Sequence, residues 1–501
     1  MALLYSAASL ATPSGTMKLI IKLHPEITIK SDDVRRRFTR LLESNVRNVF
    51  KPYEFKVAVH NRWDKLELVA AADTPEQQQQ VRAQLKCIPG IEQCLLVKES
   101  DYQDLDDIYQ QVKQVWGDKL AGKTFAVRAK RRGKHEFSSM EVARYVGGGL
   151  NQNCNTAGVK LKNPDVTIEL EVNKDKLLII HERFKCLGGM PLPTQEDVVS
   201  LISGGFDSSV ASFQMIRRGA RTHFCFFNLG GREHEIGVKQ VCKYLWQRYS
   251  ASHRVKFIGV DFEPVVAEIL EKVDNGLMGV VLKRMMMRAA ALVADKLATS
   301  TIVTGECMGQ VSSQTLANLD VINKATDKLV LRPLIAMDKS EIIRQAREIG
   351  VEDLAAGIPE YCGVISKKPT VKAILERVEE EEAKLSADLI ERVVYAADMQ
   401  DIRRIVKEAE HQVSSAETSS TLPEAAVVVD IRSQDEVDDK PLSLDGIAIE
   451  HIPFFKLATQ FAELPQDREY YLYCDRGVMS QMQALLLKEQ GYSNVRVYRP
   501  K

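Results

Sequence analysis

Hydrophobic and polar positions in the first hundred residues predict a small α+β unit. From Met17 the segment MKLIIKLHPEITIK alternates as a strand does, and SDDVRRRFTRLLESNVRNVF then shows helical spacing behind a serine or aspartate N-cap. FKVAVHNRWDKLELVAA has the pattern of two strands around a short turn, and a helix at 75–87 and the strand IEQCLLVKES follow. The order strand-helix-strand-strand-helix-strand predicts a ferredoxin-like unit.

A second α+β unit is predicted directly after the first. A helix in DIYQQVKQVW leads to a basic strand in KTFAVRAKRRG, a helix in SSMEVARYVGGGLNQ and the paired strands DVTIELEVN and KLLIIHERF. Beyond Pro191 and Pro193 the pattern changes. The β-branched or apolar strands VVSLI, HFCFFNL, VKFIGVDF, TIVTGE and LVLRPLI alternate with helices, which predicts a parallel sheet.

The last part of the chain is predicted to contain helices, a linker and another small domain. Residues 371–412 have helical character, and the Ser/Thr-rich segment QVSSAETSSTLPE follows. AVVVDIRS, IAIEHIPF, YLYC and VRVYRP then alternate with loops and a helix as a small α/β domain does.

Composition narrows the class of protein. A chain of 501 residues exceeds one hydrophobic core, so roughly three to four domains are expected. No apolar run approaches the roughly 18 residues of a membrane span, so no membrane partner is expected. The 68 basic and 68 acidic residues cancel, so a nucleic-acid surface must come from local clustering. Nine cysteines without a C-x-x-C pair fit a reducing cytoplasm better than a disulfide framework or a zinc site.

Ser203-Gly204-Gly205-Phe206-Asp207-Ser208 lies between a predicted strand and a predicted helix, where open α/β sheets bind ligands. Glycines let backbone amides turn toward an anion, hydroxyls add donors, and the helix N-terminus attracts negative charge. The segment therefore predicts a phosphate-binding loop, with a tight turn built for geometry alone as the less favoured alternative. The loop after TIVTGE, which includes Gly305, Glu306 and the run Gln310 to Thr315, would lie at the same sheet edge.

Two other segments raise the question of phosphate or nucleic-acid binding. Gly117 to Thr124 satisfies the Walker pattern G-x-x-x-x-G-K-T, but it is predicted to leave a helix and enter a strand, so we reject it. The basic strand carries five cations within seven residues, and Gly147-Gly148-Gly149 follows at a helix end, which together suit an RNA backbone. A solvated basic edge strand explains the same charges equally well. The five cations are Arg128, Lys130, Arg131, Arg132 and Lys134.

Cys474 follows a predicted strand in the loop Cys474-Asp475-Arg476-Gly477-Val478-Met479-Ser480. A thiol among backbone amides near a helix N-terminus favours the thiolate. A C-x5-R phosphatase loop would need arginine at position 480, where Ser480 stands, so sulfur carriage is favoured over phosphate-ester chemistry and over a structural cysteine. Cys362, in the loop Glu360-Tyr361-Cys362-Gly363, is a candidate second thiol, and the other cysteines are assigned to packing.

These motifs resemble those of the bacterial tRNA 4-thiouridine synthetase family, also called tRNA sulfurtransferases or thiamine biosynthesis sulfurtransferases. The resemblance is collinear from Met17 to Lys501, and only residues 1–16 have no counterpart. It rests on MKLIIKLHPEITIK, KRRGKHEFSS, RYVGGGLNQ, SLISGGFDS, FFNLGG, LKRMM, TGE with GQVSSQT, EYCGVISK and CDRGVMS. The implied fold is multidomain α/β: an extension at 1–16, a ferredoxin-like domain at 17–78, a THUMP domain at 79–183, a PP-loop pyrophosphatase domain with a doubly wound parallel sheet at 184–411, a linker at 412–421 and a rhodanese domain at 422–501.

The resemblance also implies roles for single residues. The ATP contacts would be Leu201, Ile202, Lys283, Gly305 and Gln314, and the pyrophosphate contacts would be Ser203, Gly204, Gly205, Asp207 and Ser208. Asp207 would be needed for adenylation, and Lys339 would be a further functional residue of the same domain. Cys474 would carry a persulfide and Cys362 would form a disulfide with it.

The implied activity is ATP-dependent sulfur transfer from a cysteine persulfide to the tRNA uridine between the acceptor and D stems, by way of a uridine adenylate. ATP, with Mg, is expected, and no tightly bound metal or organic cofactor. The expected partners are tRNA, a cysteine desulfurase, the thiamine sulfur-carrier protein and an external reductant. A PP-loop amide or lysine ligase and a non-catalytic RNA-binding scaffold are the competing classes.

Overall fold

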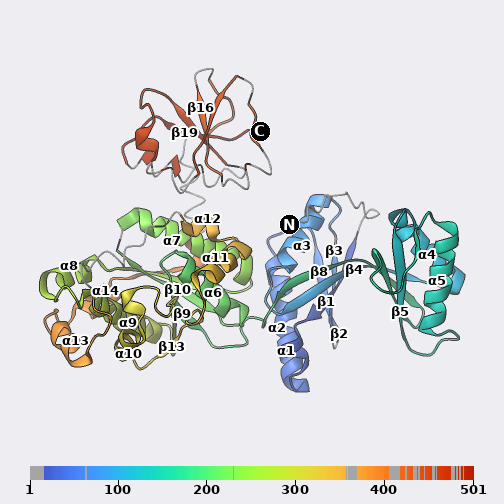
Figure 1. Cartoon of the computed structure of the whole chain (residues 1–501), viewed down its shortest axis with the longest axis horizontal. Helices are drawn as coiled ribbons and strands as arrows, with labels where there is room; N and C mark the ends of the chain where they lie inside the picture. Colours follow the sequence, from blue (N-terminus) through green and yellow to red (C-terminus); the bar gives the residue numbers. More distant parts are fainter. Residues whose placement is uncertain are drawn as a thin grey trace. The chain divides into compact units, whose positions relative to one another are not determined.

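The structure is a computed structural model, and it divides into two compact units between Thr194 and Gln195, each described by itself (Figure 1). It describes residues 16–62, 65–229, 231–356 (of 231–233 only the backbone), 358, 369–405, 418–423, 426–432, 437, 441–444, 446–453, 457, 460–474, 480, 483–484, 487–488 and 490–500.

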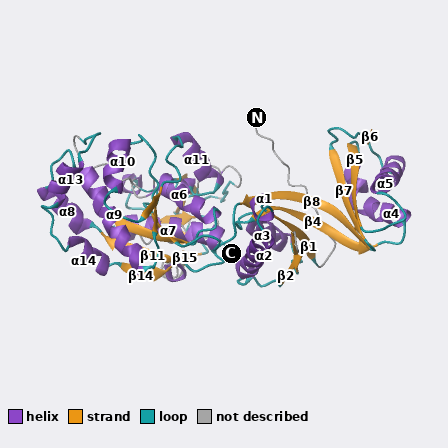
Figure 2. Ribbon diagram, turned by 90° about the horizontal axis from the view of Figure 1, so that it is seen from below, coloured by secondary structure: helices purple, strands orange, loops and turns teal. Residues whose placement is uncertain are grey.

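The N-terminal unit is built on one eight-stranded sheet with the order β2-β3-β1-β4-β8-β7-β5-β6. The strands are β1 (Met17–Leu23), β2 (Val57–Arg62), β3 (Lys65–Ala70), β4 (Ile91–Asp101), β5 (Thr124–Arg132), β6 (Gly158–Val159), β7 (Val166–Asn173) and β8 (Lys176–Gly188). The helices are α1 (Pro25–Thr28), α2 (Asp32–Phe50), α3 (Pro75–Leu85), α4 (Leu105–Trp116) and α5 (Ser139–Asn153). Figure 2 shows β4 and β8 as the long strands that run through this sheet.

Two hydrophobic cores lie along this sheet. The first packs α2 and α3 against β1 to β4, and it includes Val81, Leu85 and Phe184. The second packs α4 and α5 against β5, β7 and β8. The first core therefore draws on residues beyond position 78, where the sequence places the end of the first domain. The domain limits themselves stay a prediction.

The second unit contains a six-stranded sheet with the order β13-β12-β9-β10-β11-β14. Its strands are β9 (Val198–Leu201), β10 (Thr222–Asn228), β11 (Lys256–Asp261), β12 (Thr301–Val303), β13 (Leu329–Leu331) and β14 (Asp398–Asp401). The first five run parallel, as expected from near-continuous apolar strands between helices. The helices are α6 (Phe206–Arg217), α7 (Gly231–Leu245), α8 (Glu263–Lys272), α9 (Met278–Lys296), α10 (Leu316–Asn323), α11 (Lys339–Glu348), α12 (Glu352–Ala356), α13 (Leu375–Glu382) and α14 (Leu389–Tyr395).

Strand β14 corrects the expectation of continuous helix over 371–412. Helix α14 ends at Tyr395, Asp398–Asp401 pairs antiparallel with β11, and helix resumes at 402–405. This pairing satisfies the backbone groups on the edge of β11, which a helix could not do.

The end of the second unit forms a five-stranded parallel sheet with the order β15-β19-β18-β16-β17. Its strands are β15 (Thr418–Ser419), β16 (Val427–Asp430), β17 (Ala448–His451), β18 (Tyr470–Tyr473) and β19 (Val495–Tyr498). β16 and β18 are buried along their whole length between two hydrophobic clusters. The multidomain α/β fold predicted from the sequence is thus confirmed.

Candidate functional site

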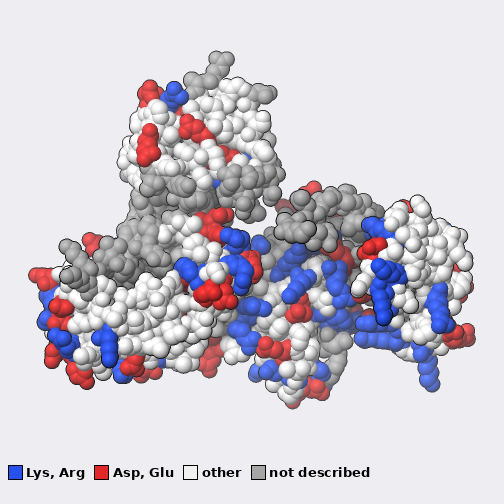
Figure 3. All heavy atoms as spheres, viewed as in Figure 1, with Lys and Arg blue, Asp and Glu red and all other residues white. Residues whose placement is uncertain are grey.

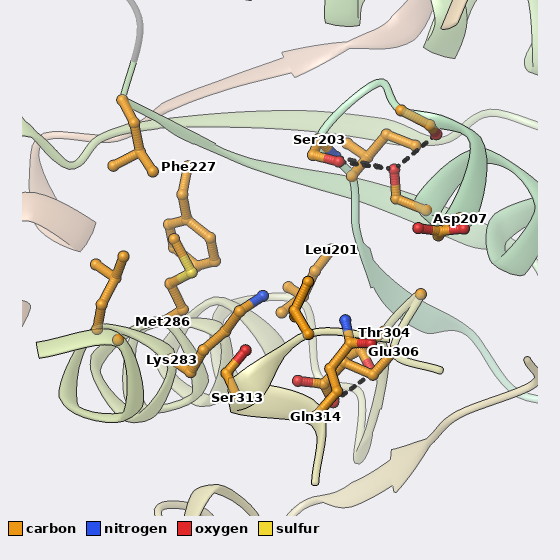
Figure 4. Close-up of a pocket in the computed structure, with 18 of the residues that line it drawn as sticks. Leu201, Ser203, Asp207, Phe227, Lys283, Met286, Thr304, Glu306, Ser313 and Gln314 are labelled. Carbon is orange, nitrogen blue, oxygen red and sulfur yellow. Dashed lines mark hydrogen bonds between the residues drawn. The ribbon is translucent and has the colours of Figure 1, made fainter. Parts of the chain in front are cut away.

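The glycine-rich loop Ser203-Gly204-Gly205 lies at the switch point of the six-stranded sheet. β9 is followed in the chain by β10 on one side, whereas β12 pairs with its other side. Loops that leave neighbouring strands in opposite directions open a crevice at the carboxyl edge of a parallel sheet. A cavity of about 560 Å³ opens there, between the loop after β9, the loop after β12 and helix α9 (Figure 4).

Most of the residues predicted to hold ATP line this one cavity. They are Leu201, Ile202, Ser203, Gly205, Asp207, Ser208, Lys283, Gly305 and Gln314. Figure 4 shows that Ser203 and Asp207 come from the glycine-rich loop and the start of α6, while Lys283 and Gln314 come from other elements. The structure therefore brings together residues that are up to 113 positions apart in the chain, since 314 − 201 is 113.

Gly204 is required by the shape of the loop. Its φ is +84°, a conformation that side chains disfavour, and a Cβ atom there would collide with Ile358 and lie 3.0 Å from Val238 Cγ2. The backbone N–H of Ser203 donates to Ser208 Oγ at 3.1 Å, and Ser209 Oγ donates to the carbonyl of Gly205 at 2.7 Å. These hydrogen bonds hold the loop on the first turn of α6, where backbone amides and the helix dipole favour an anion.

Asp207, in the first turn of α6, is paired with a lysine from a distant helix. Lys339 Nζ donates to Asp207 Oδ1 at 2.9 Å and to Oδ2 at 3.0 Å. Lys339 is the first residue of α11, which Asp338 caps. Gln310 Nε2 also donates to Asp207 Oδ2, at 3.2 Å. One carboxylate and one ammonium thus meet beside the glycine-rich loop, where a phosphate chain would end.

Gly305 allows the loop after β12 to approach α6 closely. A Cβ atom on Gly305 would lie 2.6 Å from Ser208 N and 2.7 Å from the carbonyl carbon of Asp207. Because these are backbone atoms, they cannot move aside as a side chain would. Gln314 stabilises the same loop, since its Oε1 accepts from the backbone N–H of Cys307 at 3.3 Å.

Lys283 reaches the cavity from α9, and a buried ion pair holds that helix. Its neighbour Arg284 is 1% exposed and pairs with Glu382 of α13. Arg284 Nη1 also donates to the carbonyl of Val321 at 2.6 Å. Helix α9 begins at Met278, five residues before Lys283. Lys283 is therefore positioned within a rigid helix rather than at its end.

Several cavity residues were missed by sequence reasoning. Phe227, Met286 and Met287 give it an apolar wall that suits a flat ring. His234 lines the cavity and its Nε2 lies 3.2 Å from the carbonyl of Ser203. Burial lowers the pKa of His234, which favours the neutral ring beside the loop. The sequence signal for this wall is the spacing of the two methionines on the helix that carries Lys283.

Cys474 directly follows β18 at the carboxyl edge of the five-stranded sheet. Its side chain is half-buried, and Ser480 donates its backbone N–H to Cys474 Sγ at 3.4 Å. Asp430 and Arg432, both 2% exposed, form an ion pair at the end of the neighbouring strand β16, and the Arg432 guanidinium lies over the Tyr473 ring. Residues 475–479 lie outside the described part of the chain.

Cys362 also lies outside the described residues. Ile358 and Pro369, on either side of it in the sequence, both line the cavity. Burial raises the pKa of Cys225 to about 12 and that of Cys242 well above its usual value, as expected for packing thiols.

All five predicted RNA-contacting side chains are exposed: Arg128, Lys130, Arg131 and Arg132 lie on β5, and Lys134 lies two residues beyond its end. Lys and Arg are prominent on the face of the N-terminal unit shown in Figure 3. Three of the five have protein partners: Arg128 Nη2 donates to the carbonyl of Leu161 at 2.6 Å, Arg131 Nη1 donates to the carbonyl of His135 at 3.4 Å, and Arg132 pairs with Glu171 at 3.2 Å. Their role in RNA binding stays a prediction.

The glycine run and the Walker-like segment have structural explanations. Gly147 to Gly149 lie inside α5 rather than at its end, and a Cβ atom on Gly149 would lie 2.6 Å from the Tyr109 ring. Gly149 thus lets α4 and α5 pack closely, and the part of this run in nucleic-acid binding stays a prediction. The Walker-like segment runs from the end of α4 through a short 3-10 turn to β5, so its rejection agrees with the structure.

Fold and site together define a nucleotide-binding α/β enzyme with a separate small domain that presents a cysteine. Four family models match the chain: a ferredoxin-like domain of thiamine biosynthesis proteins at 18–94, a THUMP domain at 102–182, the thiamine biosynthesis protein itself at 193–387 and a rhodanese-like domain at 414–499. In the described part of the chain no helix is long and apolar enough to cross a membrane, and no group of three or more metal-binding side chains is found.

Relatives along the full chain make the family certain. The tRNA sulfurtransferases of Shewanella piezotolerans and Shewanella loihica are each 59% identical over 484 residues, which is 97% of this chain and all of theirs. The chain belongs to the tRNA sulfurtransferase family. A crystal structure of a 4-thiouridine synthetase in complex with RNA and bound ATP is 26% identical, with a TM-score of 0.68 over 77% of this chain and 99% of that one. A protein of Pyrococcus horikoshii, 19% identical with a TM-score of 0.52 over 67% of this chain and 99% of its own, shares the fold.

Proposed function

We propose that this chain uses ATP to replace the C4 oxygen of a tRNA uridine with sulfur, forming 4-thiouridine. The observation that carries the proposal is the phosphate-type loop at Ser203 to Ser208 with the Asp207 and Lys339 pair beside it. The solved 4-thiouridine synthetase, which is similar in fold and was crystallised with RNA and ATP, supports the same reaction.

A uracil carbonyl oxygen is a poor leaving group, so it must be activated first. In the proposed step O4 attacks the α-phosphorus of ATP and pyrophosphate departs with the electrons of the broken P–O bond. The electrons of the N3–H bond form the N3=C4 double bond, and the N3 proton passes to a base. Asp207 is the carboxylate at the phosphate end of the cavity and is the candidate base, while Lys339 and the loop amides offset the phosphate charge.

The apolar wall of Phe227, Met286 and Met287 suits the adenine ring, and Lys283 and Gln314 would orient the nucleotide. Mg²⁺ prefers oxygen ligands and usually arrives bound to phosphates. The described residues hold no cluster of metal ligands, and Asp207 is the carboxylate placed to accept an ion carried by ATP. A resident metal is not part of the proposal.

Cys474 is proposed to carry the sulfur as a persulfide supplied by a cysteine desulfurase. In one order, the terminal sulfur attacks C4 of the adenylate, AMP leaves, and Cys362 then attacks Cys474 Sγ and releases the thiolated uridine. In the other order, Cys362 first attacks Sγ of the Cys474 persulfide, and the sulfide that is released attacks C4 and displaces AMP. Either order leaves a disulfide between Cys362 and Cys474, and an external reductant restores both thiols. Cys362 is four residues from Ile358, which spans at most roughly 14 Å of extended chain, so the cavity wall lies within its reach.

The remaining partners follow from the same proposal. tRNA is the acceptor, bound with the help of the exposed cations of β5, and this acceptor fits the expected cytoplasmic location. The rhodanese-like domain would also deliver sulfur to the thiamine sulfur-carrier protein.

One experiment separates this proposal from the competing classes. The enzyme is incubated with labelled ATP, tRNA, cysteine and a cysteine desulfurase, and the nucleosides are then analysed by mass spectrometry. We expect AMP, pyrophosphate and 4-thiouridine, all dependent on tRNA. AMP formed with an amine substrate and without tRNA would indicate a ligase, and no AMP at all would indicate a scaffold.

A further inference from the structure

The side-chain amide of Gln310 forms a hydrogen bond through its nitrogen, whereas its oxygen has no hydrogen-bond partner among the described residues. It lies in the loop after β12 and lines the nucleotide cavity. Its Nε2 donates to Asp207 Oδ2 at 3.2 Å, whereas its Oε1 is buried and has no hydrogen-bond partner among the described residues. A buried carbonyl oxygen without a donor costs free energy, so such an atom inside a cavity indicates a ligand that donates to it.

The orientation of this amide is fixed by chemistry. A carboxylate only accepts hydrogen bonds, so the amide must present its NH2 group to Asp207. The opposite arrangement would place two acceptor oxygens face to face. The loop itself is held by its backbone, since Gly309 N donates to Gln314 O at 2.8 Å and Gln314 N donates to Val311 O at 2.9 Å. The partnerless atom is therefore the carbonyl oxygen, held beside the Asp207 and Lys339 pair.

The chemistry at this end of the cavity limits what can donate to that oxygen. Phosphate groups of ATP are acceptors, and its adenine and ribose donors belong at the apolar wall with Phe227 and Met286 rather than beside Asp207. Uracil, the base that is to receive the sulfur, has one N–H donor in its ring next to the reacting carbon C4. This donor is N3–H, and its nitrogen is bonded directly to C4. Cytosine has no hydrogen at N3, so it offers an acceptor there instead.

We propose that Gln310 reads the uridine base, with its Oε1 accepting the N3–H of the uracil that is to be thiolated. The inference rests on the proposed function and names the residue that selects and orients its acceptor. This hydrogen bond aligns the N3–C4 edge of the base, so that O4 is directed toward the phosphate held by the loop at Ser203 to Ser208. A base without a hydrogen at N3 leaves the buried oxygen unsatisfied, which is a strong source of discrimination.

A glutamine also suits the state that follows adenylation. When O4 bonds to phosphorus and the N3–H electrons form the N3=C4 bond, the amide relays the proton: Oε1 takes the proton from N3 while Nε2 gives one of its own to the Asp207 carboxylate. N3 then accepts a hydrogen bond from the Oε1–H group, and the amide nitrogen accepts one from the Asp207 carboxylic acid. The same side chain satisfies both states, which a methionine of similar length cannot do.

The test is a cycle that pairs a change in the protein with a change of one atom in the RNA. Wild-type enzyme and Gln310→Met are each given two tRNA transcripts, one unmodified and one with 3-deazauridine, in which C–H replaces N3–H, at the thiolated position. Single-turnover pyrophosphate release at saturating ATP is the measured rate. Each enzyme is characterised by the ratio of its rates with the two RNAs. Because both enzymes are given the same two bases, the intrinsic difference in reactivity between the bases enters both ratios equally and cancels when the ratios are compared.

We expect the preference for uridine over 3-deazauridine to be about 5- to 150-fold smaller in Gln310→Met than in wild type, because the variant has no hydrogen bond to lose. Gln314→Met serves as the matched comparison from the same loop. It should raise the KM for ATP but leave the ratio as in wild type. Equal ratios in wild type and Gln310→Met would overturn the role of Gln310, since a residue that only supports Asp207 slows both RNAs alike.

Two further measurements keep the outcomes distinct. ATP affinity and unfolding temperature show whether Gln310→Met is folded, and if it is not, Gln310→Asn, which keeps the amide but shortens its reach, takes its place in the same cycle. If wild type releases no pyrophosphate with unmodified tRNA, the proposed function fails. If wild type is active and the ratios are equal, only the assignment of Gln310 fails.

Discussion

Lys339 Nζ lies within hydrogen-bond distance of both carboxylate oxygens of Asp207, although the two residues are 132 positions apart. Each sits in the first turn of its own helix, α11 and α6, at the carboxyl edge of the parallel sheet. Helix N-termini attract anions, so the site gathers one ammonium and two helix ends around the position of the phosphates. The two hydrogen bonds from Lys339 hold the Asp207 carboxylate in one orientation.

Replacing Lys339 with Met should slow adenylation while the protein stays folded. A hydrogen bond to a charged group contributes about 1.5–3 kcal/mol, so kcat/KM for tRNA-dependent pyrophosphate release should fall about 10- to 150-fold. Lys324→Met is the matched control, because Lys324 is an exposed lysine paired with Asp320 at 2.8 Å on the surface. Equal rates for Lys339→Met and this control would rule out the role of Lys339.

Gly305→Ala should weaken ATP binding through the backbone of α6. The new methyl group would lie 2.6 Å from Ser208 N, so either the loop after β12 or the first turn of α6 must shift. We expect the Kd for ATP, measured by calorimetry, to rise at least about 10-fold, since a displaced loop loses donors worth about 1 kcal/mol or more each. Gly148→Ala is the control, because nothing lies within 4 Å of its Cβ position in α5. Unchanged ATP affinity in Gly305→Ala would show that the close approach does not matter.

The phosphate-type loop could be predicted from the sequence because all its signals are local. A strand, two glycines, small hydroxyl residues and a helix occur in order between Val198 and Arg217. The pairing of Asp207 with Lys339 could not be derived from any pattern, because it depends on how α11 packs against α6. The resemblance to a family supplied Lys339 as a functional residue, but not its partner.

The misread elements share a physical cause. β14 has only four residues, Asp398–Asp401, and forms because β11 offers an edge, which no local propensity reveals. Gly147 to Gly149 suggested a helix end, yet the contact with Tyr109 makes glycine useful inside α5. In both cases a tertiary neighbour outweighed the local preference. The partnerless oxygen of Gln310 likewise exists only because the loop after β12 folds against Asp207.

His181 should make the N-terminal unit less stable as the pH falls below neutrality. Burial, together with the nearby Lys119 and Lys98, lowers the pKa of His181 in β8 to about 4. The unfolded chain, with an ordinary histidine pKa near 6.5, binds the proton more readily, so acidification from about pH 6.5 to 4 favours unfolding. The loss should not exceed ~2 kcal/mol, because solvent screens a ring that is only partly buried.

The measurement is urea unfolding between pH 7.5 and 5. In His181→Gln the midpoint should fall less over this range than in wild type, because the variant cannot gain a proton there. A midpoint that falls by the same amount in both proteins would assign the acid sensitivity to other groups.

Cys474→Ala should abolish thiolation without affecting adenylation. The sulfur of Cys474 is the group that we propose to carry the persulfide, whereas the cavity at Ser203 to Ser208 binds ATP without it. The variant should therefore still release pyrophosphate with tRNA, but form no 4-thiouridine when a cysteine desulfurase is the sulfur donor. Cys154→Ala is the matched control, because Cys154 is a half-buried free thiol of the N-terminal unit.

Ser480→Ala tests how the sulfur is activated. Its backbone N–H, which donates to Cys474 Sγ at 3.4 Å, remains in the variant, while the hydroxyl 3.5 Å from the sulfur is removed. If the backbone N–H is the donor that serves the sulfur during transfer, the single-turnover rate of 4-thiouridine formation should stay within about 2-fold of wild type. A fall of about 10-fold or more would assign the role to the hydroxyl, and thiolation by Cys474→Ala itself would refute sulfur carriage by this cysteine.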